Sequence, residues 1–260
     1  MLESFDISWL LALLPSFLLV LARVAGLIIF APFLGSSAIP VRLRLALAVL
    51  LAVALFSFVG GTFTAPSNLG HFVVALLGEL TVGLVIGLGA ALIFVGVRLA
   101  GLLIGQQIGI SLADVFDPTF EGQSSILGRL FFMLTLVLFL LFGGHRVLIG
   151  ALLGSFSDIQ PGSFSFASLP AAGLTALLSQ AYLLAIRFAA PALVAVFLAT
   201  VSLSFIARTI PQLNIISVGF PVQISTATLV LIISPGSVCL AFQTSLTGAL
   251  ESVGRLFAFV

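Results

Sequence analysis

Hydrophobic residues dominate the chain, and the few charged or turn-forming residues divide it into about six apolar segments. We expect all six to be helices, because a helix satisfies its own backbone hydrogen bonds whereas an open sheet edge leaves its polar groups unpaired in lipid. The fourth segment either ends at the Gly-Gly-His-Arg turn or continues past it to residue 153. The segments cover approximately residues 7–30, 43–58, 71–104, 129–142, 169–207 and 219–260.

Composition places this pattern in a membrane. Hydrophobic residues make up 61% of the chain and charged residues 7%, with a mean hydropathy of +1.38, whereas a soluble domain carries about 25% charged residues. The stretch from Thr209 to Leu250 has no formal charge, and about 20 apolar residues suffice to cross a bilayer. We therefore predict an all-α, polytopic membrane protein of about six long hydrophobic helices.

Charge and cysteine usage exclude several classes of function. The net charge is +1 and all nine basic residues are arginines, so no basic face is available for nucleic acid. The single cysteine, Cys239, excludes an internal disulfide and a multi-cysteine metal site. Three acids lie close together after residue 110, but their spacing is not that of a calcium-binding EF-hand loop. We expect no metal, no cofactor and no enzymatic activity.

The third segment is too long for one ordinary span. Residues 71–104 would form a helix about 51 Å long, against a hydrocarbon core of roughly 30 Å. We expect part of this helix to stand outside the lipid and to pack on apolar partner subunits. Glycines at helical spacing offer close packing surfaces for such partners: Gly83 with Gly87, and Gly101 with Gly105 and Gly109.

Five charged residues lie within or at the ends of the apolar segments: Arg23, Glu79, Arg98, Arg187 and Arg208. A charge at the centre of a bilayer costs about 2.5–3.5 kcal/mol on insertion scales, so such residues usually face protein or a water-filled cavity. Glu79 is the one acid in the middle of a segment, and we expect it to pair with a buried arginine of this chain or with a donor on a neighbour. A salt bridge without a transport role also explains it.

Residues 105–128 form a polar, glycine-rich stretch between two very apolar segments. Irregular polar backbone at membrane depth is tolerated where it is buried in protein or lines a cavity. The stretch therefore fits a plug that seals a conduit, although an exposed connecting loop would fit it as well. The candidate plug residues are Gln107, Ile110, Leu112, Val115, Phe116, Asp117 and Pro118.

Four motifs, in order along the chain, resemble those of a known family. They are GELTVG at residues 78–83, GQQIGISLADVFDP at 105–118, GGHR at 143–146 and ARTIPQLNIISVGFP at 207–221. Together they resemble the FliR family, whose members are subunits of the bacterial type III export gate. The resemblance covers essentially the whole chain. We divide the chain into N-terminal helices with the plug loop, residues 1–155, and a C-terminal helical hairpin, residues 156–260.

The resemblance implies a function and a set of partners. FliR-like subunits join FliP-like and FliQ-like subunits in a helical gate at the flagellar basal body, in the bacterial inner membrane, and FlhB-like and FlhA-like proteins act with that gate. Unfolded flagellar proteins are the exported substrates. The resemblance also implies that much of the helical mass lies outside the bilayer plane, and it places the channel plug at about residues 107–123. Asp114 and Glu121 make this stretch more acidic than the family pattern.

Three other interpretations remain. A virulence-type (injectisome) homologue of the same gate would carry nearly the same pattern. A solute transporter would need internal repeats and a binding site within this chain, and we find neither. An intramembrane serine protease would use Ser111 in Gly-Ile-Ser-Leu as the nucleophile and His145 as its base, which is a weak four-residue match.

Overall fold

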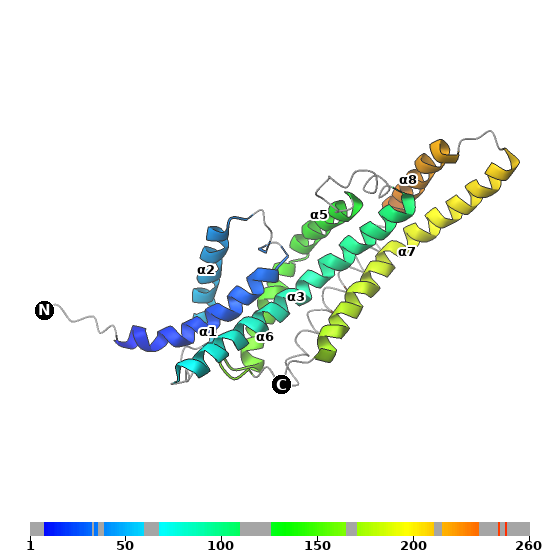
Figure 1. The fold of residues 1–260 in the computed structure, drawn as a ribbon. Coiled ribbons are helices and arrows are strands. Elements are labelled where there is room, and N and C mark those ends of the chain that lie inside the picture. Colours follow the sequence, from blue (N-terminus) through cyan, green and yellow to red (C-terminus); the bar gives the residue numbers. More distant parts are fainter. Residues whose placement is uncertain are drawn as a thin grey trace. The chain divides into compact units, whose positions relative to one another are not determined.

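A computed structural model describes residues 8–32, 34–35, 39–59, 68–109, 126–164, 171–210 and 215–233, together with 244 and 248. Its regular elements within these ranges are all α-helices (Figure 1), which confirms the predicted fold class. In chain order they are α1 (Ser8–Phe30), α2 (Val41–Val59), α3 (Leu69–Ile108), α5 (Ile126–Leu141), α6 (Gly144–Asp158), α7 (Ala171–Thr209) and α8 (Ile215–Ile233).

The bounds of α1, α2, α3 and α7 follow the expected segments closely, whereas the sixth segment, residues 219–260, is described as a helix only up to Ile233 and lies mostly outside the described residues beyond it. The fourth segment differs from a single straight helix. The fourth segment is two helices, α5 and α6, which meet at an angle of 69°. Gly143 lies between them in the left-handed region, with φ 69°. Glycine adopts this conformation without steric cost because it has no Cβ. The Gly-Gly-His-Arg turn therefore breaks the segment, and the helix does not run straight through it.

Two helices are much longer than a bilayer requires. α3 has 40 residues and α7 has 39, so each is about 60 Å long at 1.5 Å per residue. By length and composition, four of the described helices are able to cross a membrane, or up to five if the bent α5–α6 pair counts as one span. The four are α1, α2, α3 and α7.

The helices group into two compact units, and α3 and α7 each contribute to both. The first unit comprises Met1–Ala91, Gly143–Leu177 and Gly248–Val260. Within it α1 packs along α2, where the rings of Phe17 and Phe56 meet edge to face with centroids 5.8 Å apart. The expected division between residues 155 and 156 stays a prediction.

The second unit comprises Leu92–Phe142 and Leu178–Thr247. Aromatic contacts join its helices: Phe94 of α3 meets Phe139 of α5, and Phe131 of α5 meets Phe188 of α7, with ring centroids 5.5 and 5.8 Å apart. A hydrogen bond of 3.0 Å from the Gln223 side-chain amide to the Thr200 hydroxyl joins α8 to α7. Aromatic packing and this interhelical hydrogen bond are thus among the interactions that join the described helices of the second unit.

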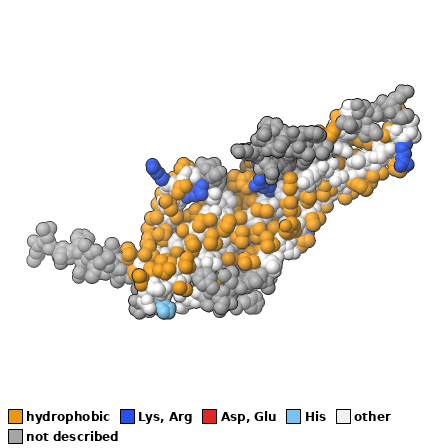
Figure 2. Space-filling view, viewed as in Figure 1, with side chains coloured by type: hydrophobic (Ala, Val, Ile, Leu, Met, Phe, Trp, Pro, Cys, Tyr) orange, Lys and Arg blue, Asp and Glu red, His pale blue; other side chains and the backbone are white. Residues whose placement is uncertain are grey.

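Much of the apolar surface is exposed. Only 17% of the residues in the apolar spans of α2 and α7 are buried, against 67% in that of α3. Hydrophobic side chains accordingly cover most of the face shown in Figure 2. Exposed apolar patches of this extent indicate contact with lipid or with other proteins. α3 is thus the helix most enclosed by its own chain, whereas α2 and α7 offer their sides to other molecules.

Candidate functional site

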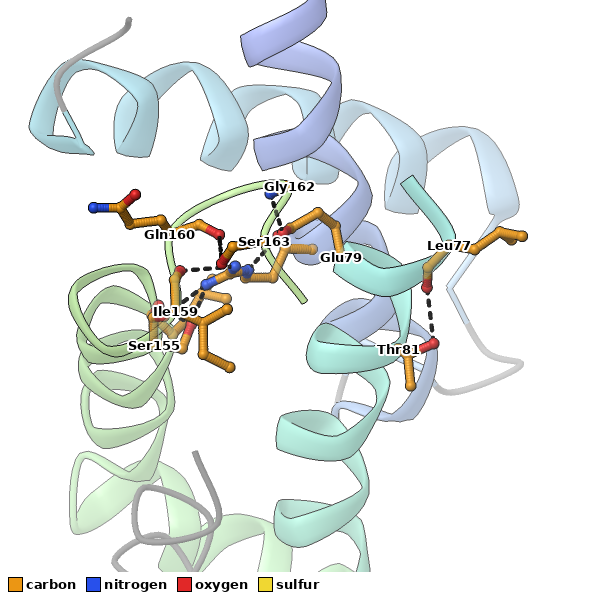
Figure 3. Close-up of polar contacts among 10 residues, drawn as sticks. Leu77, Glu79, Thr81, Ser155, Ile159, Gln160, Gly162 and Ser163 are labelled. Atoms are coloured by element: carbon orange, nitrogen blue, oxygen red, sulfur yellow. Dashed lines mark hydrogen bonds and ion pairs between the residues drawn. The ribbon is translucent and has the colours of Figure 1, made fainter. Parts of the chain in front are cut away.

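A fully buried ion pair lies in the first unit, between α1 and α3. The Arg23 guanidinium donates from Nε to Oε2 of Glu79 over 2.6 Å, and both side chains have no exposed surface. The arginine guanidinium remains charged inside proteins. A buried charge of this kind needs close partners, and the surrounding residues supply them (Figure 3).

The C-terminal end of α6 provides three more acceptors for Arg23. One terminal nitrogen donates to the Ser155 carbonyl at 2.7 Å and to the Ser155 hydroxyl at 3.1 Å, and the other donates to the Ile159 carbonyl at 3.2 Å. The carbonyls at the end of a helix form the negative end of its dipole, and the Ser155 carbonyl accepts from Arg23 in addition to the Ile159 N–H. A guanidinium is therefore well placed here, and it also lies 4.2 Å from the ring centroid of Phe156.

The turn after α6 completes the cluster by binding Glu79. The backbone N–H of Gly162 donates to Oε1 of Glu79 at 2.8 Å. Gly162 has φ 88°, a conformation that favours glycine, and the Ser163 N–H closes the turn onto the Gln160 carbonyl at 3.1 Å. Figure 3 shows this contact from α3 to the turn. Each carboxylate oxygen of Glu79 thus has its own donor.

These contacts define what the Arg23–Glu79 cluster does chemically. We use this name for Arg23, Glu79, Ser155, Ile159 and Gly162. Within the described residues no buried side-chain nitrogen or oxygen is without a hydrogen-bond partner. The cluster therefore has no unpaired donor or acceptor that could bind a substrate. The cluster therefore joins three elements, α1, α3 and the end of α6 with its following turn.

Close packing of glycines brings α1 and α3 near enough for this pairing. A Cβ on Gly83 would overlap the Arg23 carbonyl oxygen, and a Cβ on Gly87 would lie 2.6 Å from the Leu27 carbonyl oxygen. On α1, a Cβ at Gly26 would overlap the Leu80 carbonyl oxygen. The contacts advance in the same direction along both helices, so α1 and α3 run parallel. Gly83 and Gly87 thus pack within the chain.

The other charged residues singled out from the sequence lie elsewhere. Arg98 is exposed on α3, and Arg187 and Arg208 are exposed on α7. Of the five, the structure brings together only Arg23 and Glu79. An assembly role for the three exposed arginines stays a prediction.

The other glycines singled out from the sequence, Gly101, Gly105 and Gly109, do not form one helix face. A Cβ on Gly101 would lie 2.6 Å from Gly128 Cα, at the start of α5. Gly105 is buried. Gly109 lies just past the end of α3 with φ 85°, and its N–H donates to the Gln106 carbonyl at 3.1 Å. Gly109 thus belongs to the helix end, a place typical for left-handed glycine.

Most of the candidate plug falls outside the described residues. Gln107 is exposed in the last turn of α3. The other members are not described: Ile110, Leu112, Val115, Phe116, Asp117 and Pro118. Ser111, on which the protease interpretation depends, is not described either, whereas His145 is exposed at the start of α6.

Sequence reasoning missed the partners that α6 and its following turn contribute. Ser155, Phe156 and Ile159 look like ordinary members of an apolar helix, and their role depends on backbone carbonyls that carry no sequence signal. The sequence does indicate a turn at Gly162, because Pro161-Gly162 is a turn-forming pair. It also places Gly26 on the same side of its helix as Arg23, since the two are three residues apart.

Comparison with known proteins shows the family to which this chain belongs. The profile of the family described as bacterial export proteins, family 1, matches residues 14–249. The flagellar biosynthetic protein FliR of Bacillus subtilis (strain 168) is 30% identical over 258 residues, covering 95% of this chain and 96% of that protein. The chain belongs to the FliR family. The FliR of Escherichia coli (strain K12) is 31% identical over 210 residues, 79% of this chain and 78% of that protein.

FliR-family membership extends over both units, since the matched range 14–249 includes every described helix apart from the first residues of α1. The secretion system apparatus protein SsaT of Salmonella typhimurium is also similar, with 30% identity over 158 residues. That match covers 60% of this chain and 61% of SsaT. The flagellar relatives therefore match a larger share of the chain than this secretion-system relative does.

Proposed function

We propose that this chain is a subunit of the flagellar type III export gate in the bacterial inner membrane, at the flagellar basal body. With FliP-like and FliQ-like subunits it forms the channel through which unfolded flagellar proteins pass, and FlhB-like and FlhA-like proteins act with that channel. The observation that carries the proposal is the 30% identity to a flagellar biosynthetic protein over 95% of this chain and 96% of that relative.

The exposed apolar helices support an assembled rather than a solitary state. α2 and α7 bury few of their apolar residues within the chain, and α7 is about twice as long as a bilayer is thick. Lipid alone would leave roughly half of such a helix in water. Other subunits of the export apparatus would cover the remainder, so the proposal accounts for length and apolar surface together.

The Arg23–Glu79 cluster would give this subunit a fixed shape for assembly. It joins α1, α3 and the end of α6, and a buried polar network with every group satisfied specifies one arrangement of its helices. A gate built from several different subunits needs each to present a constant surface. We assign the cluster this positioning role.

We further propose that residues 107–123 form the plug that closes the resting channel. The support comes from the sequence: a polar, glycine-flanked stretch between two apolar helices, with Ile110, Leu112, Val115 and Phe116 interleaved. Apolar side chains at a constriction exclude water and so raise the barrier to ion passage. The resemblance of residues 105–118 to the plug-bearing motif of the family points the same way.

A deletion strain tests the proposed function. Removing the gene should abolish swimming and the appearance of filament protein in the culture medium, while the filament protein still accumulates inside the cell. Restoring the chain should restore both. Normal flagella in the deletion strain, together with loss of secretion of injected virulence proteins, would instead support the injectisome interpretation and overturn the flagellar one.

A further inference from the structure

Arg187 occupies an unusual place on α7. It lies within one turn of the midpoint of this 39-residue apolar helix, and its side chain is exposed. Within the part of the chain that the structure describes, no hydrogen bond or ion pair reaches it. The exposed residues nearest to it along the helix include the apolar Leu183, Ile186 and Val194, each about half exposed. The exposed Gln180 lies two turns before Arg187 on the same face. An isolated guanidinium therefore stands in a mainly apolar stripe.

A second polar group lies in the same turn. Pro191 is inside α7 and has no backbone N–H, so the carbonyl of Arg187, four residues before it, loses its usual intrahelical donor. A backbone carbonyl without a partner is unfavourable in a dry environment. The Arg187 turn, residues 187–191, thus presents a cation and a backbone carbonyl that lacks its usual donor, on a mainly apolar surface.

The composition of this surface distinguishes its possible neighbours. Hydrocarbon is a poor neighbour, because an arginine at membrane depth is costly unless it is paired or hydrated. A wide aqueous channel is also a poor neighbour, since Leu183 and Val194 lie one and two turns away on the same stripe as Arg187. A protein helix with an apolar face and one anionic side chain satisfies both the stripe and the guanidinium. A carboxylate accepts two parallel hydrogen bonds from arginine.

We propose that the Arg187 turn of α7 docks against an apolar helix of a different export-apparatus subunit, and that this helix presents a carboxylate to Arg187. The inference rests on the proposed function, because it takes the neighbour to be another subunit of the gate. The acids of this chain's own described helices do not fit the role in a second copy: Glu79 is buried and paired with Arg23, and Asp158 lies at the end of α6.

The test compares three substitutions in cells that contain the whole apparatus: Arg187→Lys, Arg187→Leu and Arg187→Glu. The amount of assembled complex that co-purifies with each tagged chain in mild detergent is measured per chain produced. We expect Arg187→Lys to stay within about twofold of wild type and Arg187→Glu to fall by about tenfold or more, because like charges at an interface are strongly unfavourable. Arg187→Leu should also fall, since it leaves the partner carboxylate without its cation.

A matched control is Arg42→Leu, the same chemical change at an exposed arginine in the first turn of α2, and it should leave assembly unchanged. Replacing the partner's acid by arginine should restore assembly in the Arg187→Glu background. Equal or greater assembly of Arg187→Leu would show that this surface faces lipid or water, and would overturn the inference. Co-purification of two differently tagged copies of this chain, lost in Arg187→Glu, would overturn it in favour of self-association.

These outcomes are separate from the test of the proposed function. If Arg187→Leu assembles and exports like wild type while the deletion strain still fails to export, the docking inference is wrong and the gate function stands. If the deletion strain exports normally, the gate function itself is wrong.

Discussion

At the scale of single residues, the molecule depends on an arginine with no exposed surface. Arg23 makes four hydrogen bonds, to Glu79, to the Ser155 carbonyl and hydroxyl, and to the Ile159 carbonyl. Desolvating two opposite charges costs several kcal/mol per ion, and their attraction offsets this only when the geometry is good and the remaining donors are satisfied. That condition is met here, so replacing either Arg23 or Glu79 alone should strongly destabilise the folded protein.

Removing the carboxylate tests this directly. We expect Glu79→Ala to destabilise the protein by about 3–5 kcal/mol, because it leaves the buried Arg23 charge unpaired. Glu79→Asp should cost less, since it keeps the charge on a shorter side chain. The measurement is the loss of folded chain on heating in mild detergent, together with the yield of assembled complex. Asp158→Ala, an exposed acid at the end of α6, is the matched control, and equal behaviour of Glu79→Ala and the control would refute the assignment.

Coupling between the two residues gives an independent check. In the double variant Arg23→Met with Glu79→Met, no unpaired charge remains, so the total destabilisation should be clearly smaller than the sum of the two single effects, by about 1–3 kcal/mol. Thermal unfolding of the four proteins in the same detergent measures this. Strict additivity would mean that the two side chains do not stabilise one another.

The sequence predicts part of this site. A lone acid within an apolar segment must have a partner, and Arg23 was among the arginines embedded in such segments. The sequence does not select Arg23 over Arg98, Arg187 or Arg208, because the choice depends on which helices lie side by side. The sequence gives no sign that the carbonyls of Ser155 and Ile159 bind Arg23, since every residue has a carbonyl and only the fold brings these two to the guanidinium.

At the scale of whole helices, α3 is the element around which its neighbours pack. Within the first unit Gly83 and Gly87 lie against α1, and within the second unit Gly96 lies against α7 and Gly101 against α5. Small residues allow helix backbones to approach closely in a membrane protein, where packing replaces the hydrophobic effect as the driving force. The helix therefore buries a large share of its span despite its length.

Adding bulk at one of these glycines should separate the helices. Gly83→Val would place its side chain on the Arg23 carbonyl, and overpacking of this kind costs about 1–3 kcal/mol or more. Gly150→Ala is the control, because a Cβ there meets nothing within 4 Å, and alanine in a helix is favoured over glycine by about 0.5–1 kcal/mol. We expect Gly83→Val to lower thermal resistance in detergent and Gly150→Ala to preserve or raise it. The reverse order would contradict the close α1–α3 contact.

Deleting part of the proposed plug addresses the connection between α3 and α5. Removal of residues 111–117 should leave assembly largely intact but make the inner membrane permeable to ions and small solutes, because the apolar seal is lost. Uptake of a small polar dye by cells carrying the deletion measures this, with cells that lack the whole chain as the tight control. A complex that assembles and stays as impermeable as wild type would show that these residues only connect two helices.

Helix positions were predicted better than helix shapes. The apolar segments locate α1, α2, α3 and α7 to within a few residues, because runs of hydrophobic residues bounded by turn formers carry a strong signal. The break between α5 and α6 was left open, since the helical pattern continues on both sides of Gly143 and only its left-handed φ shows the bend. The end of α3 at Ile108 separates Gly109 from Gly101 and Gly105, which spacing alone does not reveal.

At the scale of the whole molecule, the main feature is a large exposed apolar surface, which any proposed function must account for. α2 and α7 leave most of their apolar side chains uncovered within the chain, and α3 and α7 exceed the thickness of a bilayer. A solute transporter would be complete as one chain and would enclose its own binding site. A gate subunit instead leaves surface for lipid and for other subunits, in agreement with membership of an export family.

Native mass spectrometry of the detergent-solubilised chain, produced together with the other membrane subunits of its export apparatus, tests this account most directly. The account predicts that the chain is found in one large hetero-oligomeric species containing those subunits, and that it is unstable or aggregates when produced alone. A stable monomer of 27.0 kDa, unchanged by the presence of the other subunits, would contradict it.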